Sequence, residues 1–333
     1  MNNNQEQDNL LQEVFDLIWY KIFPKDEKIE IPDIPEIPDK IDYKLPKRNH
    51  GQGIKIPIGE GLKGPIVLDL KKNPHSYIVG TTGSGKSVCS KSILTSLITT
   101  YSPRELEIYL ADPKRVELSL FRNTKHCKKF VYEIEDITTL VADLLEETNK
   151  RYDLFMEKEV TSIFEYNRLP GVTKLKYQVL FVEEIVLLLM DPKKRAMRLL
   201  KQLTAISRAS GLYVFLTTQR PDNTVIDNVV KANINNRICF KVEDTKNSIV
   251  ALDKEGAELL PRAGRGLIKR GYKVEEFQGY YISDKQVKEI IAPYKRNKQL
   301  VKGIVEKPKN SNNKATCTKQ EKNIIDLSFL NNL

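Results

Sequence analysis

The sequence predicts an α/β protein in which helices flank a mostly parallel β-sheet. Two observations predict it. From about residue 54 to residue 298, short apolar runs alternate with longer helical stretches, and a glycine-rich octapeptide joins one of the runs directly to the next helix. Strands that alternate with helices pair in parallel through right-handed crossovers. With 333 residues, 40% of them hydrophobic and 29% charged, the chain can bury a substantial core.

The expected strands are short runs of β-branched, aromatic and other apolar side chains, which pack well on a pleated surface. In chain order they are 66–70, 77–79, 107–111, 129–132, 178–182, 212–217 and 237–242. The expected helices are stretches in which apolar residues recur at helical spacing. They are 86–100, 137–156, 193–210 and 224–232. This core is expected to form one domain over residues 54–298.

The flanking segments differ in composition. Residues 1–23 are predicted to form an amphipathic helix, because the apolar stretch 10–23 is interrupted by charges and is too short to span a bilayer. Residues 24–53 are predicted to be an extended, proline-rich linker, and residues 299–333 a basic, largely disordered tail. The apolar face of the N-terminal helix could pack on the body, on a partner or on a membrane surface. Since no signal peptide or membrane span is evident, we expect a cytoplasmic protein, with recruitment to a membrane through partners as one option.

Charge and cysteine content narrow the possible partners. The net charge is +10, and the basic excess lies after residue 60, where 46 Lys and Arg face 32 Asp and Glu. Such an excess favours a polyanion such as nucleic acid, and a solvated lysine-rich surface is the alternative. The four cysteines, Cys89, Cys127, Cys239 and Cys317, lack metal-site spacing and are expected to be free thiols in a reducing compartment.

The octapeptide fits the phosphate-binding pattern G-x-x-x-x-G-K-[S/T] at every position. Its residues are Gly80, Thr81, Thr82, Gly83, Ser84, Gly85, Lys86 and Ser87. Glycines let the backbone N–H groups of such a loop point at phosphates at the start of a helix. Lys86 would reach the β- and γ-phosphates, and the Ser87 hydroxyl would be a ligand of Mg²⁺. With a strand before it and a helix after it, the loop predicts nucleotide binding.

Two carboxylates follow the apolar run 178–182. Glu183 stands where an acidic residue would hold Mg²⁺, and Glu184 where a carboxylate can orient and deprotonate an attacking water. The usual pair is Asp-Glu, so the extra methylene of Glu183 leaves the metal geometry open. A solvated acidic helix start, favoured by the helix dipole, is the structural alternative.

Polar residues also follow two other expected strands. Gln219 comes after the run 212–217 and is a candidate to contact the γ-phosphate and report its hydrolysis; a simple turn residue before Pro221 is equally compatible with the sequence. Residues 112–118, Asp-Pro-Lys-Arg-Val-Glu-Leu, follow the run 107–111. A strand, a proline turn and a charged helix start form a common connection, so this segment alone indicates no function.

Taken in order, these motifs resemble those of the FtsK/SpoIIIE family of DNA-pumping motors. The octapeptide is similar to the family's G-T-T-G-S-G-K-S, residues 112–118 to its D-P-K-x-x-E-L, and residues 218–221 to its T-Q-R-P. Residues 231–234 match its K-A-N-I. The resemblance covers about three quarters of the chain, from residue 54 to residue 298.

The resemblance implies a RecA-like P-loop ATPase without a transmembrane segment, which uses ATP and Mg²⁺ and assembles as a ring, expected to be a hexamer, around DNA. Its ATP would lie between subunits, where an arginine of the neighbour stabilises transition-state charge. Arg237 matches the family's position for that arginine, with a surface arginine at a strand start as the alternative, and Arg208 is a second candidate. DNA contacts would go to phosphates and be non-specific and salt-sensitive.

The expected role is DNA transfer by a conjugative or mobile element, with a relaxase and transfer-channel proteins as candidate partners. The chain lacks the N-terminal membrane helices and C-terminal winged helix of the chromosome-segregating members, so we expect a compact motor. Alternatives are an ATP-dependent DNA-binding or partition switch with little hydrolysis, and a phage or plasmid segregation or packaging motor. A small-molecule kinase is disfavoured by the acidic pair, Gln219 and Arg237.

Overall fold

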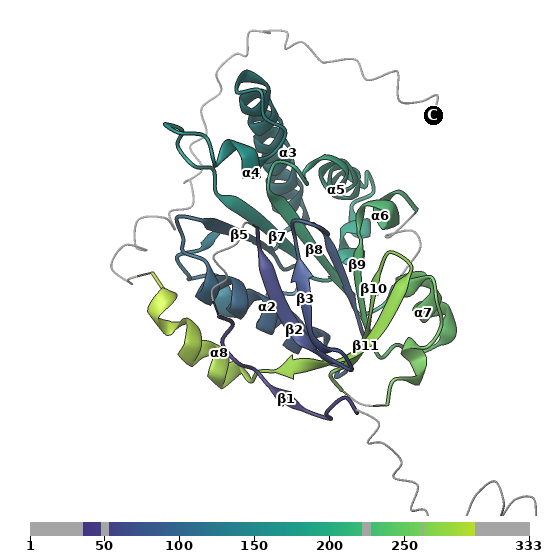
Figure 1. The fold of residues 1–333 in the computed structure, drawn as a ribbon. Helices are drawn as coiled ribbons and strands as arrows, with labels where there is room; N and C mark the ends of the chain where they lie inside the picture. Colours follow the sequence, from purple (N-terminus) through teal and green to yellow (C-terminus); the bar gives the residue numbers. More distant parts are fainter. Residues whose placement is uncertain (1–35, 48–52, 222–227, 262, 297–333) are drawn as a thin grey trace, which may run out of the picture. The chain divides into compact units, whose positions relative to one another are not determined.

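One mixed β-sheet runs through the part of the chain that the computed structural model describes, residues 36–47, 53–221, 228–261 and 263–296 (Figure 1). Its strands are β1 (Ile41–Asp42), β2 (Lys55–Gly61), β3 (Gly64–Asp69), β4 (Ser76–Val79), β5 (Leu106–Ala111), β6 (Cys127–Val131), β7 (Tyr177–Val182), β8 (Leu212–Thr218), β9 (Asn236–Phe240), β10 (Arg265–Arg270) and β11 (Lys273–Tyr281). They lie in the order β3-β2-β11-β10-β9-β4-β8-β7-β5-β6, and β1 pairs with β11.

The half of the sheet from β9 to β6 is entirely parallel, which confirms the predicted fold class. Its register matters for the site. Val79 at the end of β4 pairs with Thr218 of β8, and Val182 at the end of β7 pairs with Ala111 of β5. The segments that follow these strands therefore leave the sheet side by side at its carboxyl edge, where open α/β sheets bind their ligands.

The other half, β10-β11-β2-β3, is antiparallel. Of these strands the sequence predicted only β3. A two-residue turn, Gly271-Tyr272, joins β10 to β11, with Gly271 at a φ of +60° that glycine tolerates. The two strands mix charged residues with a few apolar ones, so they lack the continuous apolar run of the buried parallel strands.

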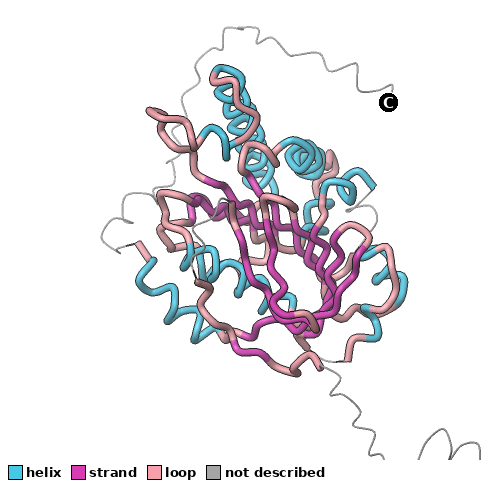
Figure 2. Tube along the Cα trace, in the orientation of Figure 1, coloured by secondary structure: helices cyan, strands magenta, loops and turns pink. Residues whose placement is uncertain are grey.

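Helices cover both faces of the parallel half (Figure 2). The helices are α2 (Lys86–Thr100), α3 (Ile134–Glu157), α4 (Ile163–Tyr166), α5 (Arg195–Ile206), α6 (Asn228–Asn233), α7 (Thr245–Leu252) and α8 (Asp284–Ile291). Helices α2 and α8 pack in one core cluster with β2 and β3, whereas α3 and α5 share the cluster on the opposite face. No helix in the described ranges is long and apolar enough to cross a membrane.

Most expected elements are present with shifted ends. Helix α2 has the expected bounds, whereas α5 ends at Ile206 instead of continuing to residue 210, because the chain turns through Gly211 at a φ of +81°. Cys89 and Cys239 are free and buried, as expected, and Cys127 is buried as well. Of the expected linker 24–53, the structure describes residues 36–47 and 53. The expected N-terminal helix and the tail 299–333 lie outside the described residues.

Candidate nucleotide-binding site

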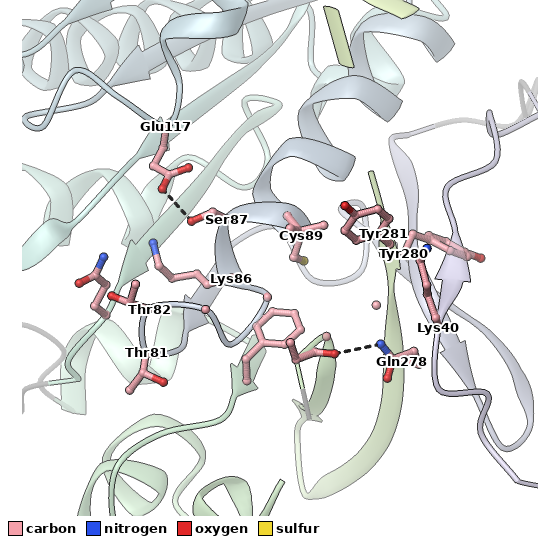
Figure 3. A pocket seen from close by; sticks show the side chains of 18 of the residues that line it. Lys40, Thr81, Thr82, Lys86, Ser87, Cys89, Glu117, Gln278, Tyr280 and Tyr281 are labelled. Atoms are coloured by element: carbon pink, nitrogen blue, oxygen red, sulfur yellow. Dashed lines mark hydrogen bonds between the residues drawn. The ribbon is translucent and has the colours of Figure 1, made fainter. Parts of the chain in front are cut away.

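The phosphate-binding loop, residues 80–87, connects β4 to α2 and is held by backbone bonds to two other segments. The Thr81 N–H and hydroxyl both donate to the Lys241 carbonyl at 3.0 Å, and the Gly264 N–H donates to the Ser84 carbonyl at 2.8 Å. The loop lines a cavity of about 550 Å³ (Figure 3). This volume is typical of small-molecule sites, which are about 300–1,000 Å³.

Glycine is required at one loop position for two reasons. Gly85, which precedes α2, has a φ of +114°, and a Cβ atom there would lie 2.8 Å from the Gly264 nitrogen. Gly83 also has a positive φ, +79°, but a Cβ there would meet nothing within 4 Å. The backbone at the start of α2 can therefore approach β10 and a phosphate closely only without a side chain at Gly85.

Lys86 and Glu183 form a buried ion pair beneath the loop. The Lys86 Nζ donates to Glu183 Oε1, the Thr217 hydroxyl donates to Glu183 Oε2 at 2.6 Å, and the two charged side chains are only 3% and 2% exposed. Neither charge could stay buried alone, because an unpaired ion in the interior costs several kcal/mol. Lys86 itself lines the cavity. Glu183 is not among the cavity-lining residues.

The Ser87 hydroxyl, the expected ligand of Mg²⁺, lies against a different carboxylate. It donates to Glu117 Oε1 at 2.9 Å, and both residues line the cavity (Figure 3). The other oxygen, Oε2 of Glu117, lies 3.8 Å from the Lys91 Nζ, which in turn lies 2.6 Å from Asp284 at the start of α8. The serine of the loop is thus connected through Glu117 and Lys91 to the C-terminal helix of the core.

Glu184 is held by three donors and is only 3% exposed. Its Oε1 accepts from the Thr218 hydroxyl at 2.7 Å and from the Gln219 N–H at 3.1 Å, and its Oε2 accepts from the Lys114 Nζ at 2.9 Å. Burial alone would raise the pKa of the Glu184 carboxyl, but these hydrogen bonds and the Lys114 charge outweigh it and lower the pKa. Its backbone is in the left-handed region, at a φ of +50°. The carboxylate is therefore ionised and oriented by its neighbours.

The segment 112–118, to which the residues alone assigned no function, supplies two of these contacts. The buried Asp112 carboxylate accepts from the Leu118 N–H at 3.0 Å, and the Asp112 carbonyl accepts from the Arg115 N–H at 2.9 Å. These bonds close the loop so that Lys114 reaches Glu184 and Glu117 reaches Ser87. Sequence reasoning missed Lys114 and Glu117 as site residues. The family motif D-P-K-x-x-E-L was the signal that could have found them.

The three remaining candidates, Gln219, Arg237 and Arg208, lie in different places. Gln219 follows β8 and lines the cavity. Arg237 is in β9, paired with Tyr77 of β4, and is not among the cavity-lining residues. Its guanidinium donates to Asp253, which also lies 2.7 Å from the Lys269 Nζ. Burial would raise the pKa of Asp253, but these two cations hold it at about 2. Arg208, the second candidate, is exposed in the turn before β8.

The chemistry of the loop suits Mg²⁺ bound together with a nucleotide. No three His, Cys, Asp or Glu side chains gather as a metal site in the described ranges. Mg²⁺ commonly binds through one or two protein oxygens, phosphates and water. The Ser87 hydroxyl at the cavity wall, with the Glu117 carboxylate beside it and Glu183 behind Lys86, fits that pattern.

Comparison with known proteins gives consistent matches. The model of the FtsK/SpoIIIE family matches residues 44–223. The DNA translocase FtsK of Clostridium tetani is 34% identical over 266 residues, which cover 78% of this chain and 35% of that protein. The DNA translocase SftA of Bacillus subtilis is 34% identical over 235 residues, which cover 68% of this chain and 25% of that protein. The chain thus spans about a quarter to a third of the length of these relatives.

A solved structure with a similar fold is the conjugation coupling protein TcpA of pCW3, in its monomer form with ATPγS. It is 29% identical, with a TM-score of 0.69, and the match covers 78% of this chain and 76% of that chain.

Proposed function

The chain belongs to the FtsK/SpoIIIE family, and we propose on that premise that it is an ATPase that moves DNA. The observation that carries the proposal is the cluster at the carboxyl edge of the sheet. There the Lys86–Glu183 pair, the oriented Glu184 carboxylate and the cavity-lining Gln219 follow three neighbouring strands. The similarity to FtsK, SftA and an ATPγS-bound coupling protein supports ATP as the nucleotide and DNA as the substrate that is moved.

In the proposed reaction each of these residues has a separate role. The γ-phosphate draws Lys86 away from Glu183, and the loop N–H groups hold the phosphates. Glu184 orients the attacking water and takes its proton, and Gln219 contacts the γ-phosphate. Ser87 and Glu183 would hold Mg²⁺, which would neutralise charge on the phosphates.

The proposed assembly is a ring, expected to be a hexamer, with ATP between subunits. Arg237 would act on the nucleotide of the neighbouring subunit, which agrees with its position away from the cavity of its own chain. In a lone chain its charge is paired with Asp253, so ring formation would have to exchange this partner for a phosphate. DNA would be bound through its phosphates, without sequence preference.

DNA-dependent ATP hydrolysis tests the proposal. The purified protein should hydrolyse ATP several-fold faster with DNA, and Lys86→Ala or Glu184→Gln should abolish the activity. An ATPase rate that neither double-stranded nor single-stranded DNA changes would contradict the proposal that the protein is a DNA motor. Mixing Arg237→Ala with Glu184→Gln subunits should restore part of the turnover if the arginine acts across an interface, and no recovery at any ratio would contradict that role.

A second candidate, an ATP-dependent DNA-binding switch, is favoured by one observation. Both oxygens of the Glu184 carboxylate accept hydrogen bonds within the protein, and Glu184 does not line the cavity. A switch would bind DNA more tightly with ATPγS and hydrolyse ATP only at a trace rate with or without DNA.

For the biological role we propose conjugative or mobile-element DNA transfer, supported by the similarity to a conjugation coupling protein. Co-purification with a relaxase or channel protein encoded beside it would test that role.

A further inference from the structure

We propose that residues 36–43, which precede the family core, form the nucleoside end of the cavity, with Asp39 and Lys40 contacting the ribose and the base. The inference rests on the proposed function, because it takes the ligand of the cavity to be a nucleoside triphosphate. The sequence pattern had indicated only an extended linker there.

The cavity extends well beyond the phosphate-binding loop. Figure 3 shows Lys86 at one end and Lys40, Tyr280 and Tyr281 at the other, with Cys89 of α2 between them. A triphosphate held by Lys86 and the start of α2 leaves its nucleoside pointing along the cavity toward Tyr280 and Tyr281. The intervening wall includes Val88, Cys89 and Phe240, apolar and aromatic side chains that suit a sugar and a base.

Residues 36–43 are fixed at this end by bonds to three elements. Strand β1 pairs in parallel with β11, with Ile41 opposite Tyr280, and the Tyr43 N–H donates to the Tyr281 carbonyl at 2.8 Å. The Tyr43 hydroxyl is 2.9 Å from the Ser96 hydroxyl of α2, the helix that begins with the phosphate-binding loop.

The third anchor is Arg265 at the start of β10. Its side chain is 6% exposed, donates to the Ile37 carbonyl at 3.0 Å and lies 3.7 Å from the Asp39 carboxylate. A guanidinium so deeply buried is costly unless it is paired, so these contacts hold the segment against the sheet. They position the exposed side chains of Asp39 and Lys40 in the cavity wall.

The chemistry of the two side chains matches a nucleoside. A carboxylate such as Asp39 can accept from ribose hydroxyls, as acidic residues do in dinucleotide sites. The Lys40 Nζ lies 4.6 Å above the centre of the Tyr281 ring, so a cation that can donate to base nitrogen or oxygen atoms lies beside an aromatic face. The two side chains would add contacts to the nucleoside and none to the triphosphate.

One consequence is that nucleotide binding and the order of the N-terminal segment are coupled. If residues 36–43 contact the nucleotide, binding stabilises their pairing with β11, and by reciprocity any partner that pulls this segment away weakens nucleotide binding. Through residues 36–43, nucleotide binding would then change the affinity of any partner that pulls this segment away from β11.

Competition binding with two probes tests the proposal. The Asp39→Ala/Lys40→Ala double variant should bind ATPγS about tenfold more weakly, equivalent to about 1.4 kcal/mol, and inorganic tripolyphosphate with unchanged affinity. Glu36→Ala/Lys44→Ala is the matched control, because it removes the same two charges from exposed residues that do not line the cavity. Lys86→Ala should weaken the binding of both probes.

Unchanged ATPγS affinity of the double variant, or an equal loss for both probes, would overturn the nucleoside site. It would leave the proposed function intact as long as the wild-type protein binds ATPγS. A wild-type protein that binds neither probe would instead contradict the proposed function itself.

Hydrogen exchange gives a second, independent measurement. ATPγS should slow amide exchange over residues 36–43 of the full chain at least several-fold, and tripolyphosphate should not. Arg265→Met should abolish this protection, whereas Arg270→Met, which removes an arginine further along β10, should retain it. Exchange over residues 36–43 that ATPγS leaves unchanged in the wild type would also overturn the proposal.

Discussion

The two ends of the cavity are built in different ways. The phosphate end is one continuous octapeptide at a strand–helix junction, where backbone N–H groups and one lysine would hold the phosphates. The nucleoside end combines Asp39 and Lys40 with Gln278, Tyr280 and Tyr281, residues that are more than 230 positions apart in the chain. The first end depends on local backbone geometry, and the second on sheet pairing between β1 and β11.

This difference predicts that substitutions at the two ends of the cavity weaken ligand binding by different amounts. The phosphate end tolerates almost no change in its backbone, because a helix start and a glycine set the positions of the N–H groups. The nucleoside end depends on several side-chain contacts of moderate strength, so each single change there should have a smaller effect. Four measurements can test this comparison.

The largest effect is expected at the phosphate end. Gly85→Ala would place a methyl group 2.8 Å from the Gly264 nitrogen at a φ of +114°, and should weaken ATPγS and tripolyphosphate binding at least about 100-fold, or about 2.7 kcal/mol. Gly83→Ala is the control, because it has positive φ but open space. It should cost only about 1–2 kcal/mol of backbone strain. Equal losses would show that strain, and not the close approach to β10, determines the requirement.

A buried histidine just before a strand of the sheet that carries both ends makes the free energy of unfolding of the whole domain depend on pH. Burial lowers the pKa of His75, at the foot of β4, to about 3, and its Nδ1 accepts from the Val214 N–H at 3.0 Å. The unfolded chain binds a proton at His75 below a pKa of about 6.5, so the free energy of unfolding falls as the pH drops below that value. The loss at pH 5 is about 2 kcal/mol.

His75→Gln removes this titration and should flatten the pH dependence of the free energy of unfolding, measured by urea denaturation between pH 5 and 7. The slope should not vanish, because burial also lowers the pKa of His126. An unchanged slope in His75→Gln would contradict the assignment.

A smaller effect is expected from the loop that holds Glu184. Lys114→Met removes a cation that lowers the pKa of Glu184, while burial, which raises it, remains. Activity that needs the ionised carboxylate should therefore be lost at a higher pH than in the wild type. We expect a several-fold lower ATPase rate near pH 6 and a smaller difference near pH 8. Lys114→Arg, which keeps the charge, should retain the wild-type pH profile, and a pH-independent loss in Lys114→Met would argue for a different role.

The smallest effect is expected at the nucleoside end. Tyr43→Phe removes the hydroxyl that contacts Ser96 of α2, and a hydrogen bond of this kind contributes about 1 kcal/mol. ATPγS binding should weaken about fivefold or less, and tripolyphosphate binding should not change. A loss as large as that of Gly85→Ala would mean that the nucleoside end is as intolerant as the phosphate end, and the comparison would fail.

The parallel half of the fold was predictable because buried strands and amphipathic helices have distinct apolar patterns. The strands β4 to β9 and the helix α2 follow those patterns closely. The antiparallel half was not predicted beyond β3, since β10 and β11 mix charged residues with a few apolar ones and lack a continuous apolar run. The same limit applied to β1, whose two residues become a strand only by pairing with β11.

The candidate site likewise has a part that the sequence predicted and a part that it did not. The loop 80–87 and the pair Glu183 and Glu184 could be recognised from their positions after apolar runs. Sequence reasoning did not identify Glu117 as the carboxylate that contacts Ser87, nor Lys114 as the cation that contacts Glu184. Both contacts bridge segments that are 30 and 70 residues apart.

The sequence by itself therefore determined the phosphate-binding loop, the parallel strands and the family motifs, since each depends on the conformation of a few consecutive residues. Only the tertiary structure decided which carboxylate meets Ser87, which cation holds Glu184, and that Asp39 and Lys40 line the cavity. Those outcomes depend on the register between strands far apart in the chain. The pairing of Ala111 with Val182, and of Ile41 with Tyr280, is selected by burial of the whole sheet and is not encoded in any short motif.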